Sequence, residues 1–142
     1  MSMYQFFASD KQLEVYDNNR IVLDSKKQLL KGKKRKISVF DEREALRIII
    51  EDDIKHMKLY TEKKYGAFIE WNYTDENAKV IIQYIERHLK VSREIELWNV
   101  WLGPKENAKI NKCSIENLTI TDIKDIWGKE FFEFAECLKI YR

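Results

Sequence analysis

Two segments that both read as β-strands flank a segment with the pattern of an amphipathic helix, and this arrangement constrains the fold most. The strand-like segments are residues 69–73 and 97–101, and each contains a Trp-Asn step. Apolar residues recur at helical spacing between them, at Ala78, Ile81, Ile82, Ile85 and Leu89. A strand, a helix and a strand in this order are typical of a β-α-β unit, which predicts two neighbouring parallel strands with a right-handed crossover.

The residues before this unit predict a first strand, a ribbon and a first long helix. Residues 4–8 are short and aromatic, as in a strand, and residues 13–23 contain two apolar runs around a central Asn-rich turn, as in a β-ribbon. Asp41 and Glu44 have the spacing of a capping box, and they precede an apolar stripe at helical spacing. We therefore expect a helix from Asp41 to about Tyr60.

The remaining residues complete a single α+β domain over residues 1–142. Thr74 is a natural N-cap for the second helix, and residues 94–102 form a strand that Gly103 and Pro104 would end. A polar loop over residues 105–117, a short helix over 119–127 and a last strand over 131–141 follow, with the pairing direction of that strand left open. The prediction is a two-layer sandwich: a mixed β-sheet of four or more strands with two long helices on one face and an N-terminal β-ribbon.

Composition places this domain in the cytoplasm. Hydrophobic residues make up 44% of the 142 residues, enough for a core, but no apolar run approaches the ~20 residues that a membrane span needs. The first residues lack the basic and apolar stretches of a secretory signal. Cys113 and Cys137 fit neither a zinc pattern nor a disulfide framework, so we expect two thiols in the reducing cytoplasm of a small bacterial protein.

The alternation of side chains along the two Trp-Asn strands predicts a binding surface. Aligning the two steps turns Trp71 and Trp98 toward the helices. The opposite face then carries a mixture of aromatic, amide and carboxylate side chains: Phe68, Glu70, Asn72, Asn99 and Trp101. Such a mixture suits a protein partner or a small polar ligand. In the alternative interpretation, the ribbon of residues 13–23 folds over this face and buries Trp101.

The charge of the chain is uneven. The net charge is +2, yet residues 26–36 hold seven basic residues and no acidic ones, so the rest of the chain is acidic. This segment could contact nucleic-acid phosphates, with the aromatic residues of the sheet stacking on bases. The basic residues proposed for RNA binding are Lys31, Lys33, Lys34, Arg35 and Lys36. A solvated loop is the other interpretation.

No motif names a reaction, a cofactor or a metal. The glycines Gly32, Gly66, Gly103 and Gly128 stand far apart, which argues against the glycine-rich phosphate loops of nucleotide-binding folds. His56 and His88 each have the pattern of a residue at the edge of a helix's apolar face, although the two side chains could lie close together in the folded chain. Asp53 falls within the apolar stripe of the first predicted helix, where it is either paired at the edge or functional.

Two function classes follow, and an enzyme is the weakest alternative because the sequence shows no acid–base or nucleophile–base pair. The first is a non-enzymatic binding or regulatory module that uses one face of its sheet. The second is a nucleic-acid-associated protein that uses the basic segment 26–36. An exposed sheet edge would also allow pairing with a second copy of the chain, as in a homodimer.

Overall fold

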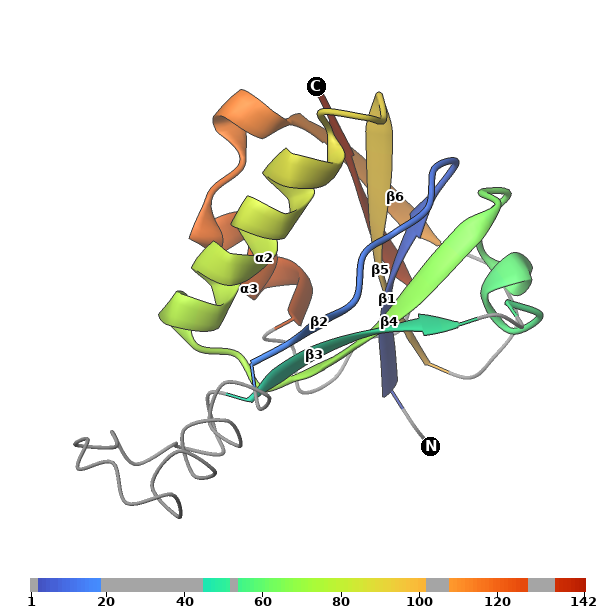
Figure 1. Cartoon of the computed structure of the whole chain (residues 1–142), viewed down its shortest axis with the longest axis horizontal. Helices are drawn as coiled ribbons and strands as arrows, with labels where there is room; N and C mark the ends of the chain where they lie inside the picture. The colour runs from blue at the N-terminus through green and yellow to red at the C-terminus, as the bar shows by residue number, and fades with distance from the viewer. Residues whose placement is uncertain (1–2, 19–44, 52–53, 102–107, 128–134) are drawn as a thin grey trace, which may run out of the picture.

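Strand β1 (Met3–Ser9) lies at the centre of the sheet, between β4 (Tyr65–Trp71) and β5 (Glu94–Trp101), and is antiparallel to both. The structure is a computed structural model that describes residues 3–18, 45–51, 54–101, 108–127 and 135–142 (Figure 1). Within these ranges the strands form one mixed sheet in the order β2-β3-β4-β1-β5-β7-β6. The predicted α+β class with a mixed sheet is therefore confirmed.

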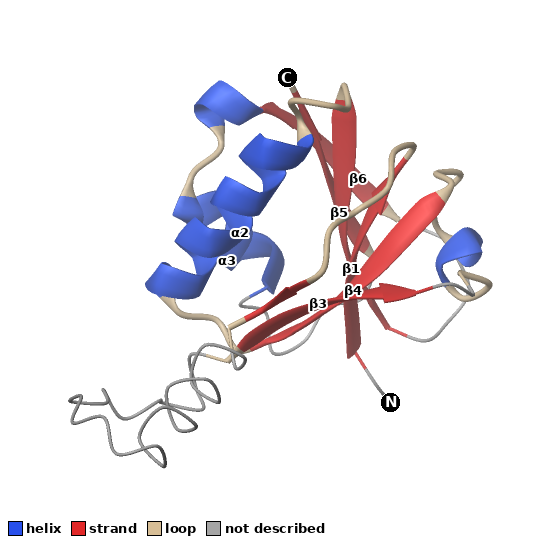
Figure 2. Ribbon diagram, in the orientation of Figure 1, coloured by secondary structure: helices blue, strands red, loops and turns tan. Residues whose placement is uncertain are grey.

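The outer strands and the helices complete this arrangement. The remaining strands are β2 (Tyr16–Asp17), β3 (Leu46–Glu51), β6 (Lys109–Ser114) and β7 (Glu136–Tyr141). The helical elements of the described residues are α2 (Asp75–His88), α3 (Ile120–Trp127) and the 3-10 turns η2 (Met57–Leu59) and η3 (Ile115–Asn117). Figure 2 shows α2 and α3 together on one side of the sheet and the short turn η2 on the other.

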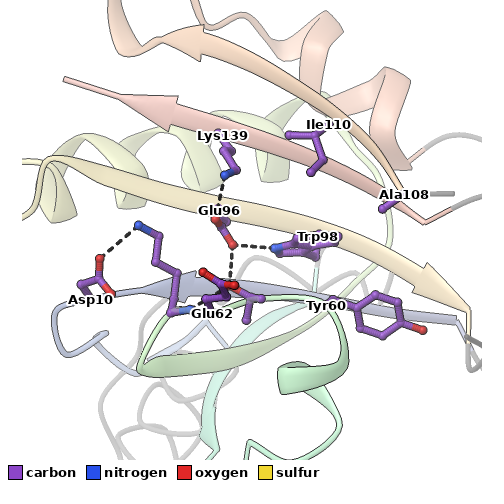
Figure 3. Close-up of a pocket in the computed structure, with 10 residues that line it drawn as sticks. Asp10, Tyr60, Glu62, Glu96, Trp98, Ala108, Ile110 and Lys139 are labelled. Carbon is purple, nitrogen blue, oxygen red and sulfur yellow. Dashed lines mark hydrogen bonds and ion pairs between the residues drawn. The ribbon is translucent and has the colours of Figure 1, made fainter. Parts of the chain in front are cut away.

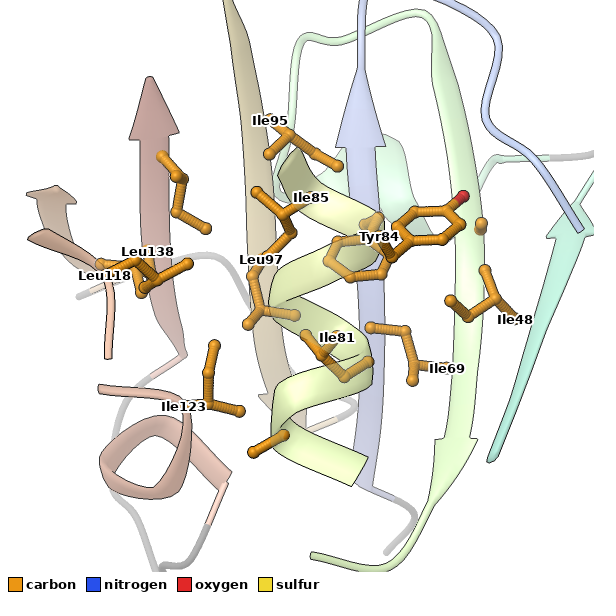
Figure 4. Packing of buried hydrophobic residues seen from close by; sticks show 14 of the residues in the cluster. Ile48, Ile69, Ile81, Tyr84, Ile85, Ile95, Leu97, Leu118, Ile123 and Leu138 are labelled. Carbon is orange, nitrogen blue, oxygen red and sulfur yellow. The ribbon is translucent and has the colours of Figure 1, made fainter. Parts of the chain in front are cut away.

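The main core lies between the sheet and the two helices. Thr74 begins α2 as predicted, because its side chain accepts a hydrogen bond from the backbone N–H of Asn77. The apolar stripe of α2, including Ile81 and Ile85, then packs on Leu97 and the neighbouring strands (Figure 4). Ile81 and Ile85 are fully buried, so this helix is fixed firmly over the inner face of the sheet.

A second, smaller core lies on the other face of the sheet, which we call the outer face. Met57 and Tyr60, from the connection between β3 and β4, pack there on Phe6 and Trp98. The ring centroids of Phe6 and Trp98 are 6.1 Å apart, and those of Tyr60 and Trp98 are 5.8 Å apart. Because this connection covers the centre of the outer face, only the parts of the face beside it are accessible.

The predicted first long helix is wrong. Residues 46–51 form strand β3, which pairs with β4 on one side and with β2 on the other. The three consecutive isoleucines at 48–50 are β-branched and favour a strand, and alternation along β3 buries Leu46 and Ile48 completely. Asp41 and Asp53 lie outside the described residues.

The predicted pairing of the two Trp-Asn strands is also wrong. They are parallel to each other, but β1 lies between them, and Phe6 is opposite both Phe68 and Trp98. Residues opposite each other share a face, so Trp98 points to the outer face with Phe68. Trp71 points to the helices, where its ring stacks on Trp127 at 5.5 Å. The two indoles therefore lie on opposite sides of the sheet.

The structure also corrects or completes the prediction at the two edges of the sheet, which are formed by β6 and by β2. Residues 109–114, predicted as part of a polar loop, form strand β6. The last strand, β7, is antiparallel to β5 and parallel to β6, which resolves its pairing direction. At the near edge, β2 pairs with β3, and the second half of the predicted ribbon lies outside the described residues.

Candidate functional site

Two of the five residues predicted for the binding surface lie together on the outer face. Phe68 is half-buried, and its ring centroid is 5.9 Å from that of Tyr4. Glu70 is exposed, and its carboxylate is 3.4 Å from the guanidinium of Arg47 on β3. These two residues form a partly aromatic and partly charged strip along β4.

The other three predicted residues do not join this strip. Asn99 is on the helix face, where its Nδ2 donates to the backbone carbonyl of Ile126, so its predicted position on the outer face is wrong. The prediction assumed that Trp98 points to the helices. Because Trp98 points to the outer face, Asn99, the next residue along β5, points to the helices. Asn72 is exposed beyond the end of β4. Trp101 ends β5 opposite Met3, and its side chain lies outside the described residues.

The interpretation that the ribbon of residues 13–23 covers the outer face is not supported by its described part. Leu13 belongs to the core on the helix side, and the backbone carbonyl of Glu14 accepts a hydrogen bond of 2.7 Å from the Tyr84 hydroxyl on α2. The segment around η2 covers the outer face instead, and it leaves one hollow on each side of Tyr60.

The smaller hollow is aromatic and has a volume of about 100 Å³. It is lined by Phe68 together with residues of β1, β5 and the η2 segment: Tyr4, Phe6, His56, Met57, Tyr60 and Val100. Phe68 is thus the predicted residue that lines a hollow of the outer face. A volume of this size holds at most a small apolar group.

The larger hollow, which we call the polar hollow, has a volume of about 390 Å³. Its lining is drawn in Figure 3 and comprises Asp10, Tyr60, Thr61, Glu62, Lys63, Glu96, Trp98, Ala108, Ile110 and Lys139. These residues come from β5, β6 and β7 and from the turns beside β1 and β4. Charged and aromatic groups converge here from parts of the chain that are far apart in sequence.

Glu96 is the central residue of the polar hollow and is only 4% exposed. Its Oε1 accepts hydrogen bonds from the Thr61 hydroxyl at 2.5 Å and from the Trp98 indole N–H at 2.9 Å. Its Oε2 is 3.6 Å from the Nζ of Lys139, as the dashed lines of Figure 3 show. A buried carboxylate is costly unless it is paired and hydrogen-bonded, and these contacts hold this one in place.

A second ion-pair group lies at the rim. The Nζ of Lys63 is 3.0 Å from the carboxylate of Asp10 and 3.3 Å from that of Glu94. Burial opposes the charge of Lys63, but the hydrogen bonds to the two carboxylates outweigh it and raise the pKa of this amine above its ordinary value. Lys63 therefore stays charged and occupied by its two partners.

The one serine–histidine pair found within the described ranges is sealed inside the protein. His88 Nε2 is 2.6 Å from Ser9 Oγ, but Ser9 is completely buried and cannot meet a substrate. Burial raises the pKa of both Cys113 and Cys137, which favours the protonated form of both thiols. His56 is exposed and lines the aromatic hollow of the outer face, whereas His88 lies on α2, on the other side of the sheet.

Three further expectations concern a metal site, a membrane span and the basic segment. In the part of the chain that the structure describes, no three His, Cys, Asp or Glu residues gather as a metal site would require. The search of the same residues for a helix long and apolar enough to span a membrane finds none. The basic segment 26–36, with Lys31, Lys33, Lys34, Arg35 and Lys36, lies outside the described residues.

Sequence reasoning missed Glu96, Thr61 and Lys139 as site residues. One signal was present, because Glu96 is a lone charge within the apolar run Ile95–Trp98. Its partners come from a turn and from the last strand, which no local pattern links to it. Comparison of the chain with protein-family models, with curated proteins and with solved structures finds no match.

Proposed function

We propose that the chain is a small, non-enzymatic binding module that takes up a small polar ligand in the polar hollow of its outer face. The observation that carries this proposal is Glu96, a buried carboxylate fixed at the floor of an open hollow of about 390 Å³. This volume is within the range of about 300–1,000 Å³ that is typical of small-molecule sites.

The placement of Glu96 favours binding over a purely structural role. Phe6, Trp98 and Val100, its neighbours on the outer face, belong to an apolar core, so the carboxylate of Glu96 carries a desolvation cost that its hydrogen bonds must offset. A buried ion pair such as Glu96–Lys139 contributes little net stability, and an apolar replacement is often neutral or stabilising. A preorganised carboxylate at the floor of a hollow is instead what orients a bound ligand.

Catalysis is not part of this proposal, because the hydroxyl–carboxylate pair that the described residues bring to the polar hollow, Thr61 and Glu96, is buried and Thr61 is only 4% exposed. The lining residues of the hollow hold carboxylates that are bound by hydroxyl, indole and ammonium groups. The serine–histidine pair of the described residues is buried elsewhere, between β1 and α2. Such a site can hold and orient a ligand. A partner protein could then bind the ligand-bound form and the free form with different affinity.

The test is a screen of small polar compounds against the full chain by two-dimensional amide NMR. A ligand of the polar hollow should shift the Trp98 indole N–H and the Thr61 amide signals, and Glu96→Gln should weaken binding at least tenfold. Glu70→Gln is the matched control, because Glu70 is an exposed carboxylate on the same face and does not line the hollow. Hits that leave the Trp98 and Thr61 signals unchanged, or no hit at all, would overturn the proposal.

The charge of the basic segment favours a second candidate, a nucleic-acid-associated protein that uses Lys31, Lys33, Lys34, Arg35 and Lys36. Contacts to phosphates make binding weaken steeply with salt. RNA binding should therefore be lost when residues 33–36 are all changed to Glu. Retention of RNA binding by this variant, or its absence in the original chain, would dismiss this candidate.

A further inference from the structure

We infer that the ligand of the polar hollow is a small organic cation, a primary amine or guanidine with a short apolar body. This inference rests on the proposed function above and adds the chemical class of the ligand. Three features of the hollow carry it: its charge balance, an oxygen atom of Glu96 that is still able to accept hydrogen bonds, and the aromatic and apolar wall.

The charge balance of the hollow favours a cation. Among the described residues, the lining and its ion-pair partners include four carboxylates, those of Asp10, Glu62, Glu94 and Glu96, but two ammonium groups, those of Lys63 and Lys139. Lys63 is held between two of the carboxylates, and Lys139 contacts Glu96. An incoming anion would meet amines that are already neutralised, whereas a cation would reduce the excess negative charge.

Glu96 keeps one oxygen that can accept from a ligand. Its Oε1 is fully used by Thr61 and the Trp98 indole. Its Oε2 lies 3.6 Å from Lys139, which is an ion-pair distance and longer than a hydrogen bond. Carboxylate oxygens accept more than one hydrogen bond, so an ammonium or guanidinium group of a ligand can donate to Oε2.

The wall beside this oxygen suits the apolar part of such a ligand. The rings of Trp98 and Tyr60 are tilted to each other at a centroid distance of 5.8 Å, and an aromatic wall attracts cations through its π-electrons. Ile110 of β6 is 49% exposed and, with Ala108, provides an apolar side. Figure 3 shows Trp98, Glu62 and Glu96 at the same hollow, with Ile110 above them.

Removal of the Lys139 ammonium would leave room for the ammonium of a ligand beside Glu96. Lys139 is the cation nearest Glu96 Oε2. If its ammonium is removed in Lys139→Met, the buried carboxylate loses that partner, and an amine from solution can take its place. The bound amine should then stabilise the variant more than it stabilises the original chain.

The experiment titrates agmatine, glutarate and 1,4-butanediol into the full chain and follows the Trp98 indole N–H by NMR. We expect agmatine alone to bind, about tenfold more tightly to Lys139→Met, and at least tenfold more weakly to Glu96→Gln, with Glu70→Gln unchanged. Thermal melting with and without agmatine provides a second readout, because a ligand that binds the folded chain raises its melting temperature.

The outcomes separate the ligand class from the proposed function. If glutarate or butanediol binds in the hollow more tightly than agmatine, the cation inference is wrong while the binding function stands. If agmatine does not bind but the screen yields an anionic or uncharged ligand that shifts Trp98 and Thr61, the same conclusion follows. If neither the three probes nor the screen gives a ligand, both proposals fail.

Discussion

The Nε2 atom of His88 lies 2.6 Å from the Oγ of Ser9, and this hydrogen bond joins the last turn of α2 to the end of β1. The backbone N–H of Lys11 also donates to Ser9 Oγ, at 3.1 Å. Ser9 is completely buried and His88 is 7% exposed. A neutral imidazole is therefore built into the contact between the helix layer and the central strand.

This contact makes stability sensitive to mild acid. Burial lowers the pKa of His88, and the opposing effect of the Glu14 charge is smaller. The unfolded chain, with a histidine pKa of about 6.5, therefore binds a proton that the folded chain does not, so the free energy of unfolding falls as the pH drops below about 6.5. Above that pH the contribution of the neutral ring is complete.

Urea unfolding at pH 7.5 and 5.5 measures this effect. The original chain should lose stability between the two pH values. His88→Gln should lose less, since glutamine does not titrate. An equal loss in His88→Gln would show that other groups cause the acid sensitivity.

Gly66 is required by close packing beneath the η2 segment. A Cβ built on Gly66 would lie within 3.2 Å of Met57 Cε and closer still to Met57 Sδ. Met57 is 1% exposed and has little room to move, so Gly66→Ala should cost about 1–3 kcal/mol. The cost should be smaller in a Met57→Ala background, as a double-mutant cycle by urea unfolding would measure. Additive effects would contradict this packing.

Gln5 and Asn99 are opposite each other on β1 and β5 and should be energetically coupled. Gln5 Oε1 accepts from the Trp71 indole at 2.6 Å, and Asn99 Nδ2 donates to Ile126, which fixes the orientation of both amides. The remaining buried atoms, Gln5 Nε2 and Asn99 Oδ1, are a donor and an acceptor that find no hydrogen-bond partner among the described residues. Residues opposite each other on neighbouring strands are in contact, so the free-energy cost of the double change to Leu should differ from the sum of the single changes by at least about 0.5 kcal/mol. Agreement with the sum within about 0.3 kcal/mol would refute the coupling.

Thr74 should contribute to the stability of α2 as its N-cap. Its side chain accepts from the Asn77 N–H at 3.0 Å, so Thr74→Ala should lower the free energy of unfolding by about 1 kcal/mol. Thr74→Asp is the control, because aspartate caps equally well and suits the helix dipole. Thermal and urea unfolding of the three proteins give the comparison, and equal loss in both variants would exclude a capping role.

Local patterns predicted α2 well because the information lies within the helix itself. Thr74 and the apolar stripe from Ala78 to Leu89 specify the start and the buried face without reference to the rest of the chain. The isoleucines of β3 were misread because a short apolar run fits a strand and a helix equally, and the partners of β3 decide between them.

The candidate site was less predictable because non-local register determines it. The face of Trp98 follows from its pairing with Phe6, which is more than ninety residues earlier, and a shift by one residue exchanges Trp98 with Asn99. Phe68 and Glu70 were placed correctly because β4 was given the correct phase. Glu96 acquires its meaning from Thr61 and Lys139, which sequence spacing does not bring together.

The central position of β1 has a consequence for biosynthesis. The ribosome makes this strand before either β4 or β5, the two neighbours that hydrogen-bond to it. The nascent chain therefore carries an apolar β-forming segment, with Phe6 and Phe7, that must wait for about sixty and then ninety further residues before both of its edges are closed. Chaperones should therefore bind this segment during translation. In the folded protein β4 and β5 cover both of its edges, so it no longer needs that protection.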